Sequence, residues 1–325
     1  LTELLPPLNS CSCLPLSDED VFVHAPGFED RTMAFAEIIQ AQPGASAILL
    51  NYLPLNEKNR LSEVRDCLTD RGVKVLEEDV VDYNRFEPGD FETRFSTRLG
   101  RRKARTAVID ISTMSKLEIM LSLNAIHRLN LSVRILYSEP ENYGPSKEEF
   151  QQGKANRDVH QPSLQVFTGV HGVVRVDSLA SVAMQGQPTA ALVFMSFNDV
   201  LTQTLLNTVY PSRLFLINGR PPEHSWRESA TAWIHDQVRR EWEEDNPVTT
   251  AVQGSVPLPT RVVSTLDYTE TVALLLELYW QYSASYRLLL APAGSKLQAV
   301  GSYIVKALHP ALHIEYPSPE GFFPR

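Results

Sequence analysis

Short apolar runs alternate with amphipathic segments along most of the chain. The apolar runs are rich in Val, Ile and Leu, which is typical of strands buried on both faces of a sheet. In the segments between them, apolar residues recur at helical spacing. The predicted strands are 20–26, 46–54, 73–80, 106–112, 132–140, 189–198, 212–222, 260–267, 286–294 and 311–319. The predicted helices are 33–42, 56–72, 91–100, 115–130, 199–209, 228–245, 268–283 and 295–308.

This order of elements predicts an α/β fold with mostly parallel sheets covered by helices on both faces. We expect two Rossmann-like doubly wound units, over residues 21–145 and 189–325. Residues 1–20 are expected to form an N-terminal arm. Residues 146–188 are expected to form a polar linker and then an antiparallel hairpin around Gly169 or Gly172.

The two halves share short motifs in the same order, and these motifs predict an internal duplication. Each half has a strand followed by a small-residue turn that ends in Ser-Lys, and the two Ser-Lys pairs are 180 positions apart. Each motif falls at the end of a predicted strand. The alternative is two unrelated α/β domains with similar turn chemistry. The matched pairs include Phe28 with Phe197, Asn51 with Asn218, Ser115 with Ser295, Lys116 with Lys296, and Tyr137 with Tyr316.

Composition narrows the class of protein. The 325 residues carry a net charge of −9, so we expect no extended nucleic-acid surface; the basic run 98–105 is either a solvated loop or a local patch for phosphate or an acidic partner. No apolar run approaches the roughly 18 residues of a membrane-spanning helix. The three cysteines lack disulfide-framework or zinc spacing, which predicts a cytoplasmic protein without a metal site.

The turn after the first strand contains the first group of candidate ligand-binding residues. Doubly wound sheets bind ligands at the carboxyl ends of their strands. Gly27 can bring backbone close to a ligand, and Arg31 can hold a phosphate in bidentate fashion. Glu29 and Asp30 suit a ribose hydroxyl, a base edge or an arginine. The alternative for this turn is a helix cap with a local acid–arginine pair.

The segment "DISTMSK" at 110–116 contains the second group. Ser112, Thr113 and Ser115 offer hydroxyls at a predicted helix start, Lys116 adds a positive charge, and Asp110 lies at the strand end. A purely structural alternative is a capping box between Ser115 and Glu118. The second half has Ala291 and Pro292 in place of polar groups, so its site is not chemically equivalent. The remaining candidates at strand ends are Asn51, Tyr137, Asn198, Ser295 and Lys296.

The segment "DISTMSK", within a Rossmann-like fold, resembles a motif of the CARF and SAVED sensor domains of prokaryotic antiviral defence systems. The corresponding CARF segment is Asp-hydrophobic-Thr-Gly-Gly-Thr-Lys, and this chain departs from it at the two glycines, where it has Thr113 and Met114. The resemblance covers one motif in each half and the architecture. It implies a fused pair of units that binds a nucleotide-like ligand, such as a cyclic oligonucleotide, and works with a protein partner or effector domain.

Three hypotheses for the function follow. The first is a ligand-sensing or regulatory module for a nucleotide-like ligand, with no cofactor. The second is an adaptor with a degenerate ligand site, whose tryptophans near 226–242 form a partner surface. The third is a nucleoside or nucleotide hydrolase or transferase that uses Asp110 with Glu29 and Asp30. Neither half contains GxGxxG or a P-loop motif, so a standard dinucleotide or P-loop site is not expected.

Overall fold

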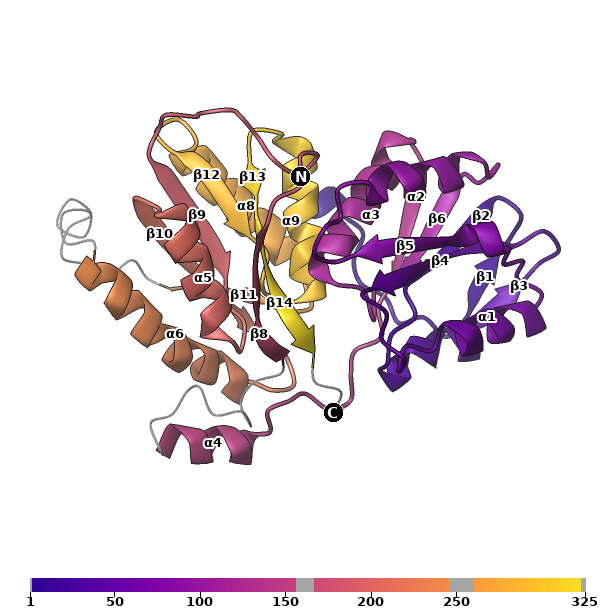
Figure 1. Cartoon of the computed structure of the whole chain (residues 1–325), viewed down its shortest axis with the longest axis horizontal. Coiled ribbons are helices and arrows are strands. Elements are labelled where there is room, and N and C mark those ends of the chain that lie inside the picture. The colour runs from indigo at the N-terminus through magenta and orange to yellow at the C-terminus, as the bar shows by residue number, and fades with distance from the viewer. Residues whose placement is uncertain (1, 156–166, 246–259, 323–325) are drawn as a thin grey trace. The chain divides into compact units, whose positions relative to one another are not determined.

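The computed structural model describes residues 2–155, 167–245 and 260–322, and these form two compact units (Figure 1). The first unit consists of residues 6–141. The second unit consists of residues 142–322 together with residues 2–5, so in sequence the first unit is inserted near the start of the second.

The first unit is built on a sheet of five parallel strands in the order β5-β4-β2-β6-β7. In chain order this is 3-2-1-4-5, the order of a doubly wound Rossmann sheet. The strand order reverses between β2 and β6, which places the topological switch point at their carboxyl ends. The strands are β2 Asp20–His24, β4 Ser46–Leu53, β5 Val80–Asn84, β6 Thr106–Asp110 and β7 Ser132–Leu136.

Helices cover both faces of this sheet. Figure 1 shows α2 (Phe91–Gly100) beside α3 (Lys116–Arg128), and α1 (Leu61–Asp70) on the opposite side of the strands. On the α1 side, the buried core includes Phe22, Phe35, Leu49 and Leu68. A small parallel pair, β1 (Leu14–Leu16) with β3 (Ile39–Ala41), extends this layer.

The second unit repeats the same strand order. Its five parallel strands run β11-β10-β9-β12-β13, again 3-2-1-4-5 in chain order. The two Rossmann-like units expected from the sequence are therefore present. The strands are β9 Thr189–Phe194, β10 Arg213–Arg220, β11 Arg261–Ser264, β12 Arg287–Ala291 and β13 His313–Ile314; the helices are α5 Asp199–Val209, α6 Trp226–Asp245, α8 Tyr268–Tyr282 and α9 Lys296–Leu308.

The repeat extends to individual positions. Helices α3 and α9 both have 13 residues, and both begin after a serine that forms a capping box, Ser115 with Glu118 and Ser295 with Gln298. Asn51 and Asn218 each occupy the sixth position of an eight-residue strand. These shared positions support a duplication, because unrelated sheets have no reason to share helix lengths and caps.

Two predicted elements of the first unit are wrong. The helix expected over 33–42 is a 3-10 helix, η2 (Asp30–Glu37), followed by β3. Ile39 enters a strand because β1 provides a pairing partner that the local pattern does not reveal. The strand expected over 73–80 begins only at Val80, after the 3-10 turn η3 (Glu77–Asp79), and its burial alternates as in a half-covered edge strand.

Two predictions for the connecting region are also wrong. The expected linker contains a helix, α4 (Lys147–Ala155), which starts with a reciprocal Ser146–Glu149 cap. The expected hairpin around Gly169 or Gly172 is one strand, β8 (Phe167–Val174). Its antiparallel partner is β14 (Tyr316–Phe322), far along the chain.

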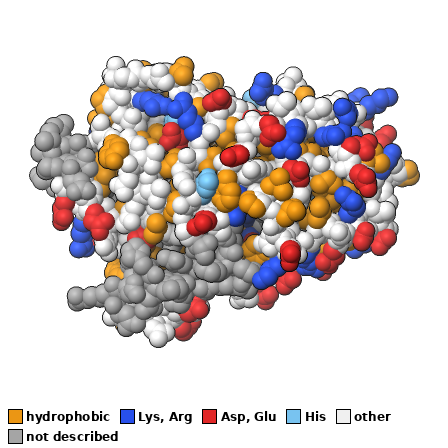
Figure 2. All heavy atoms as spheres, viewed as in Figure 1, with side chains coloured by type: hydrophobic (Ala, Val, Ile, Leu, Met, Phe, Trp, Pro, Cys, Tyr) orange, Lys and Arg blue, Asp and Glu red, His pale blue; other side chains and the backbone are white. Residues whose placement is uncertain are grey.

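Helices of the described segments are all too short or too polar to span a bilayer. Figure 2 shows acidic and basic side chains interspersed on the visible face. Within the basic run 98–105, Arg102 pairs with Asp79 and Arg105 lies 3.4 Å from Glu19. These two arginines therefore have acidic neighbours of their own.

Candidate functional site

The turns after β2 and β6 pack directly against each other at the switch point of the first unit. The Thr113 hydroxyl donates to the Ala25 carbonyl at 2.5 Å. A Cβ at position 27 would lie 3.0 Å from the Thr113 Cβ, so any other residue there would crowd the Thr113 side chain. The glycine expected to face a ligand thus allows the two turns to approach, and the Thr113 hydroxyl is used to hold them together.

A buried polar chain lies beneath these turns. His24 ends β2 and Asp110 ends β6; they are paired in register, and His24 Nδ1 lies 3.2 Å from Asp110 Oδ2 with both side chains 0% exposed. His24 Nε2 lies 3.1 Å from the Thr32 hydroxyl oxygen, which accepts a hydrogen bond from the Gly27 amide. The other oxygen of Asp110 accepts from the amide and hydroxyl of Ser112. Asp110 and Ser112 therefore support the site from below.

His24 and Thr32 are members of this chain that sequence reasoning did not select. In the sequence, His24 is a lone histidine beside the first turn, with no motif around it. The available signal was its place at the last position of a strand next to the strand that ends in Asp110. Only the strand order, with β2 between β4 and β6, brings the two residues together.

The start of α3 is fixed by a second buried network. The Ser115 hydroxyl accepts from the Glu118 amide at 3.2 Å, which confirms the capping box. The Tyr52 hydroxyl donates to Glu118 and accepts from the Ser115 amide at 2.8 Å. Burial, and then the neighbouring Glu118 carboxylate, raise the pKa of Tyr52 well above its ordinary value. Tyr52 therefore remains a neutral phenol that holds the helix start, a role the sequence pattern did not reveal.

Lys116 is the exception in this polar region. It occupies the first position of α3 and is half-buried, and burial lowers its pKa to about 8. Throughout the described parts of the chain, no residue forms a hydrogen bond or ion pair with its ammonium group. A desolvated cation without a counter-ion, at a helix N-terminus with its own positive potential, favours an anion from outside the chain.

The acidic and basic groups of the first turn are paired with each other. Arg31 Nε donates to Glu29 at 2.5 Å, and Arg31 Nη1 donates to the Ser138 carbonyl at 3.1 Å. Burial alone would lower the pKa of Arg31, but Glu29 and Tyr137 together raise it above its ordinary value. Arg31 is thus a structural cation that ties the first turn to the segment after β7.

Asp30 and Asn51 lie apart from this cluster. The Asp30 carboxylate is fully exposed, with Arg60 Nη1 at 3.3 Å. The Asn51 amide donates to Asp82 on the neighbouring strand at 2.8 Å. Neither contact brings these side chains to Lys116. Within the described residues, no group of three His, Cys, Asp or Glu side chains is arranged to hold a metal ion.

The candidates of the second unit act as helix caps. Asn198 caps α5 by accepting from the Val200 amide at 2.9 Å, and it is buried. Ser295 caps α9 and also donates to the Thr265 carbonyl at 2.6 Å. Lys296 is half-buried and has a partner. Sequence similarity at these positions therefore reflects helix starts.

The second unit has no acid–histidine pair at the corresponding strand ends. In register, Val193 of β9 lies opposite Ala291 of β12, at the positions that His24 and Asp110 occupy in the first unit. The same fold is thus built with an apolar pair at this point. The polar chain of the first unit is consequently not a requirement of the architecture.

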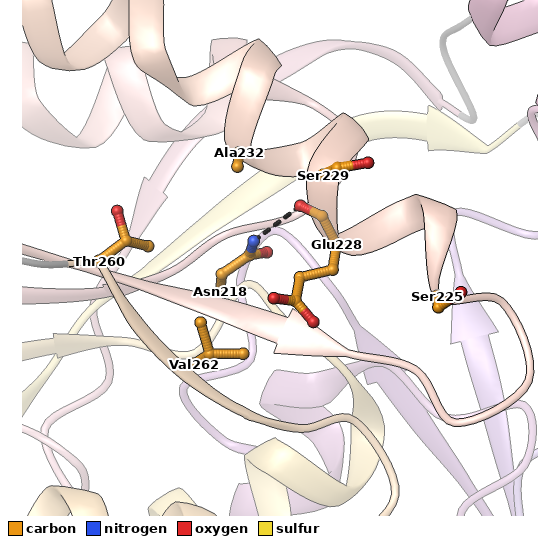
Figure 3. A pocket seen from close by; sticks show the side chains of 7 residues that line it. All are labelled: Asn218, Ser225, Glu228, Ser229, Ala232, Thr260 and Val262. Atoms are coloured by element: carbon orange, nitrogen blue, oxygen red, sulfur yellow. Dashed lines mark hydrogen bonds between the residues drawn. The ribbon is translucent and has the colours of Figure 1, made fainter.

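A hollow of about 410 Å³ lies elsewhere in the second unit, between the first turns of α6 and strands β10 and β11 (Figure 3). The Asn218 amide, which Figure 3 shows at its wall, already donates to the Glu228 carbonyl at 2.8 Å. We assign no ligand to it. Its lining residues are Asn218, Ser225, Glu228, Ser229, Ala232, Thr260 and Val262.

The tryptophans near 226–242 do not form the exposed surface that the adaptor hypothesis expects. Trp226 and Trp233 pack against the buried Phe150, and Trp242 packs against the core of the second unit. The most exposed tryptophan is instead Trp280, at 70%.

Comparison of the sequence with protein-family models finds no match, and comparison with curated proteins finds no significant match.

Proposed function

We propose that this chain is a ligand-sensing module that binds a nucleotide-like anion at the switch point of the first unit. The observation that carries the proposal is Lys116, a desolvated ammonium without a partner among the described residues. It lies at the N-terminus of α3, directly after the turn that follows β6. Phosphate groups fit this position because the first amides of a helix and a lysine supply donors and positive charge together.

Binding without catalysis fits the acids of the first unit best. Asp110 is fully buried, with Ser112 on one oxygen and His24 near the other. Glu29 is held by Arg31, and Asp30 projects into solvent. A general base has to reach a proton of the substrate, and these contacts do not bring the three carboxylates together beside Lys116.

The class of ligand comes from the resemblance of "DISTMSK" to the CARF motif. On that basis we propose a nucleotide, with cyclic oligonucleotides as the first class to test, and a role in antiviral defence. Thr113 and Met114 stand where the CARF motif has glycines, and Thr113 here donates to Ala25. Cys11, Cys13 and Cys67 are free thiols, which fits the proposed cytoplasmic location.

The test is a thermal-shift screen of the full chain against mononucleotides, dinucleotides, NAD and cyclic oligonucleotides. A ligand at 100 times its Kd stabilises the fold by about 2.7 kcal/mol, which corresponds to a melting shift of several degrees. We expect a shift with at least one nucleotide, its loss in Lys116→Ala, and its retention in Lys103→Ala, an exposed lysine of the same unit. A shift that survives Lys116→Ala would place the ligand elsewhere.

The adaptor function is the second candidate, and one observation favours it. Trp280 is 70% exposed, with the rings of Tyr279 and His309 packed around it. If no nucleotide shifts the melting temperature, we expect a protein partner or effector domain to be captured by the chain and lost in Trp280→Ala.

A further inference from the structure

Arg227 of the second unit lies in a cage of aromatic rings. Its guanidinium carbon is 4.2 Å from the ring centre of Phe197, 5.3 Å from that of Trp226 and 5.4 Å from that of Tyr143. Burial lowers its pKa to about 10, so the group remains charged at neutral pH. Its hydrogen bonds go to main-chain carbonyls: Nη2 donates to Gly144 and Nη1 to Pro145, both at 3.0 Å.

Arg227 corresponds to Arg60 of the first unit. Each follows the asparagine at the sixth position of the second strand of its unit by nine residues, since 60 − 51 and 227 − 218 both equal 9. Arg60 is paired with the carboxylates of Glu63 and Asp30. Among the described residues, no carboxylate forms an ion pair with Arg227. Both units thus have an arginine at this position, with carboxylate partners in the first unit and two main-chain carbonyl partners in the second.

Those two carbonyls belong to the segment that leads into α4, and α4 covers the same place. Phe150 of α4 is buried, and its ring centre lies 5.9 Å from those of Phe197 and Trp226 and 5.7 Å from that of Trp233. Phe197 follows β9 and Trp226 begins the helix after β10, so Phe150 lies at the carboxyl ends of two adjacent parallel strands. This edge is where doubly wound sheets bind their ligands.

We propose that residues 143–155 are a removable plug over a second anion-binding site, in which Arg227 binds a phosphate and the aromatic rings stack on a base. The chemistry fits a nucleoside monophosphate, because a guanidinium holds phosphate in bidentate fashion and aromatic faces accept any base. While the plug is in place, the Gly144 and Pro145 carbonyls occupy the donors of Arg227 and the Phe150 ring occupies the stacking faces. The proposal uses no residue of the site in the first unit, so either can fail without the other.

Equilibrium dialysis with adenosine monophosphate tests the plug in the full chain. All variants carry Lys116→Ala, which removes the proposed site of the first unit. We expect Phe150→Ala to bind the nucleotide at least tenfold more tightly than Gln152→Ala, a change at an exposed position of the same helix. Adding Arg227→Gln to Phe150→Ala should abolish that gain. No gain in folded Phe150→Ala, or a gain that persists with Arg227→Gln, would overturn the proposal.

Hydrogen exchange on the unaltered chain tests whether α4 opens independently of the sheet, even where Phe150→Ala does not fold. A removable plug opens without the sheet, so the amides of α4 should exchange at least tenfold faster than those of α5, and faster still with saturating adenosine monophosphate. Exchange of α4 only at the rate of α5 would show that α4 is a fixed part of the core.

Discussion

Two lysines with similar pKa values serve opposite purposes. Burial lowers the pKa of both Lys116 and Lys306 to about 8. Lys306 compensates for its burial, because its ammonium donates to the carbonyls of Ala180, Pro310 and Leu312 at 3.2, 2.8 and 2.8 Å. Lys116 has no such acceptors among the described residues. Lys306 therefore stabilises the fold, whereas the cost of burying Lys116 is offset by no described residue.

Replacement of each lysine by Met should separate these roles. At pH 7, we expect Lys116→Met to raise the free energy of unfolding by roughly 1–3 kcal/mol, because a desolvated charge is removed. Lys306→Met should lower it by about 1–3 kcal/mol, since buried carbonyls lose their donor. Urea unfolding of the three chains measures both changes. A destabilised Lys116→Met would show that the ammonium has a stabilising contact.

The gain in the free energy of unfolding that we expect from Lys116→Met should disappear at high pH. The pKa of Lys116 is about 8 in the folded chain and near its ordinary 10.5 in the unfolded chain. Between these values the unfolded chain binds the extra proton, so the stability contributed by this site rises with pH. Repeating the urea series from pH 7 to 10.5 should therefore bring the two chains together. A constant difference would exclude a charge effect.

At the scale of elements, the two sheets have the same strand order but different residues at the ends of their two central strands. β2 and β6 end in His24 and Asp110, whereas β9 and β12 have Val193 and Ala291 at the corresponding points. The second unit thus provides a matched apolar version of the buried pair. It also shows which change the fold tolerates.

We expect strong energetic coupling between His24 and Asp110. Asp110→Ala leaves Nδ1 of the buried His24 imidazole without its partner, and His24→Val leaves a buried carboxylate without its histidine, so each should cost about 1–3 kcal/mol or more. The double variant copies the second unit and should be at least 1 kcal/mol more stable than the sum of the single changes predicts. A double-mutant cycle by urea unfolding measures this. If the two losses in the free energy of unfolding simply add, the contact between His24 and Asp110 contributes no coupling free energy.

The sequence predicts correctly those elements whose determining residues lie within one short stretch of chain. The Ser115 cap, the 13-residue helix after it and the buried strand before it all lie within one stretch of chain. It failed where the partner is distant: β3 needs β1, and β8 needs β14. The start of α4 had a local signal in Ser146 and Glu149 that its polar surroundings concealed.

The candidate site was only partly predictable for the same reason. Its location followed from the rule on strand ends, but the sequence does not say which hydroxyls are already bonded. Thr113, Ser112 and Ser115 all bond within the chain, to Ala25, Asp110 and Glu118. Lys116 stands out only after those partners are known.

At the scale of the whole molecule, the first unit is continuous in sequence and the second is not. Every strand of the first sheet, and every helix that covers it, falls within residues 6–141. The second unit takes residues 2–5 as well as residues from 142 onward, and η1 (Thr2–Leu4) contacts α8. The first unit should therefore be separable, because its buried core is complete by itself.

Expression of residues 6–141 alone tests this. We expect a single cooperative unfolding transition by calorimetry, and the same nucleotide-induced shift as in the full chain, since Lys116 and its surroundings are all included. The fragment 142–325 is the comparison, and it should melt below the second unit of the full chain because it lacks residues 2–5. A fragment 6–141 without a transition would show that its core depends on the rest of the chain.

Because β8 pairs with β14, the second unit cannot complete this strand pair until the end of the chain has been synthesised. The first unit can fold once residue 141 has left the ribosome, but β8 waits for a partner that starts about 140 residues later, since 316 − 174 = 142. At bacterial-to-eukaryotic elongation rates of about 5–20 residues per second, that wait lasts roughly 7–30 s. During this time β8 has open hydrogen-bonding groups, the condition under which nascent chains associate with one another. The yield of folded protein should consequently depend on how quickly translation proceeds from β8 to β14.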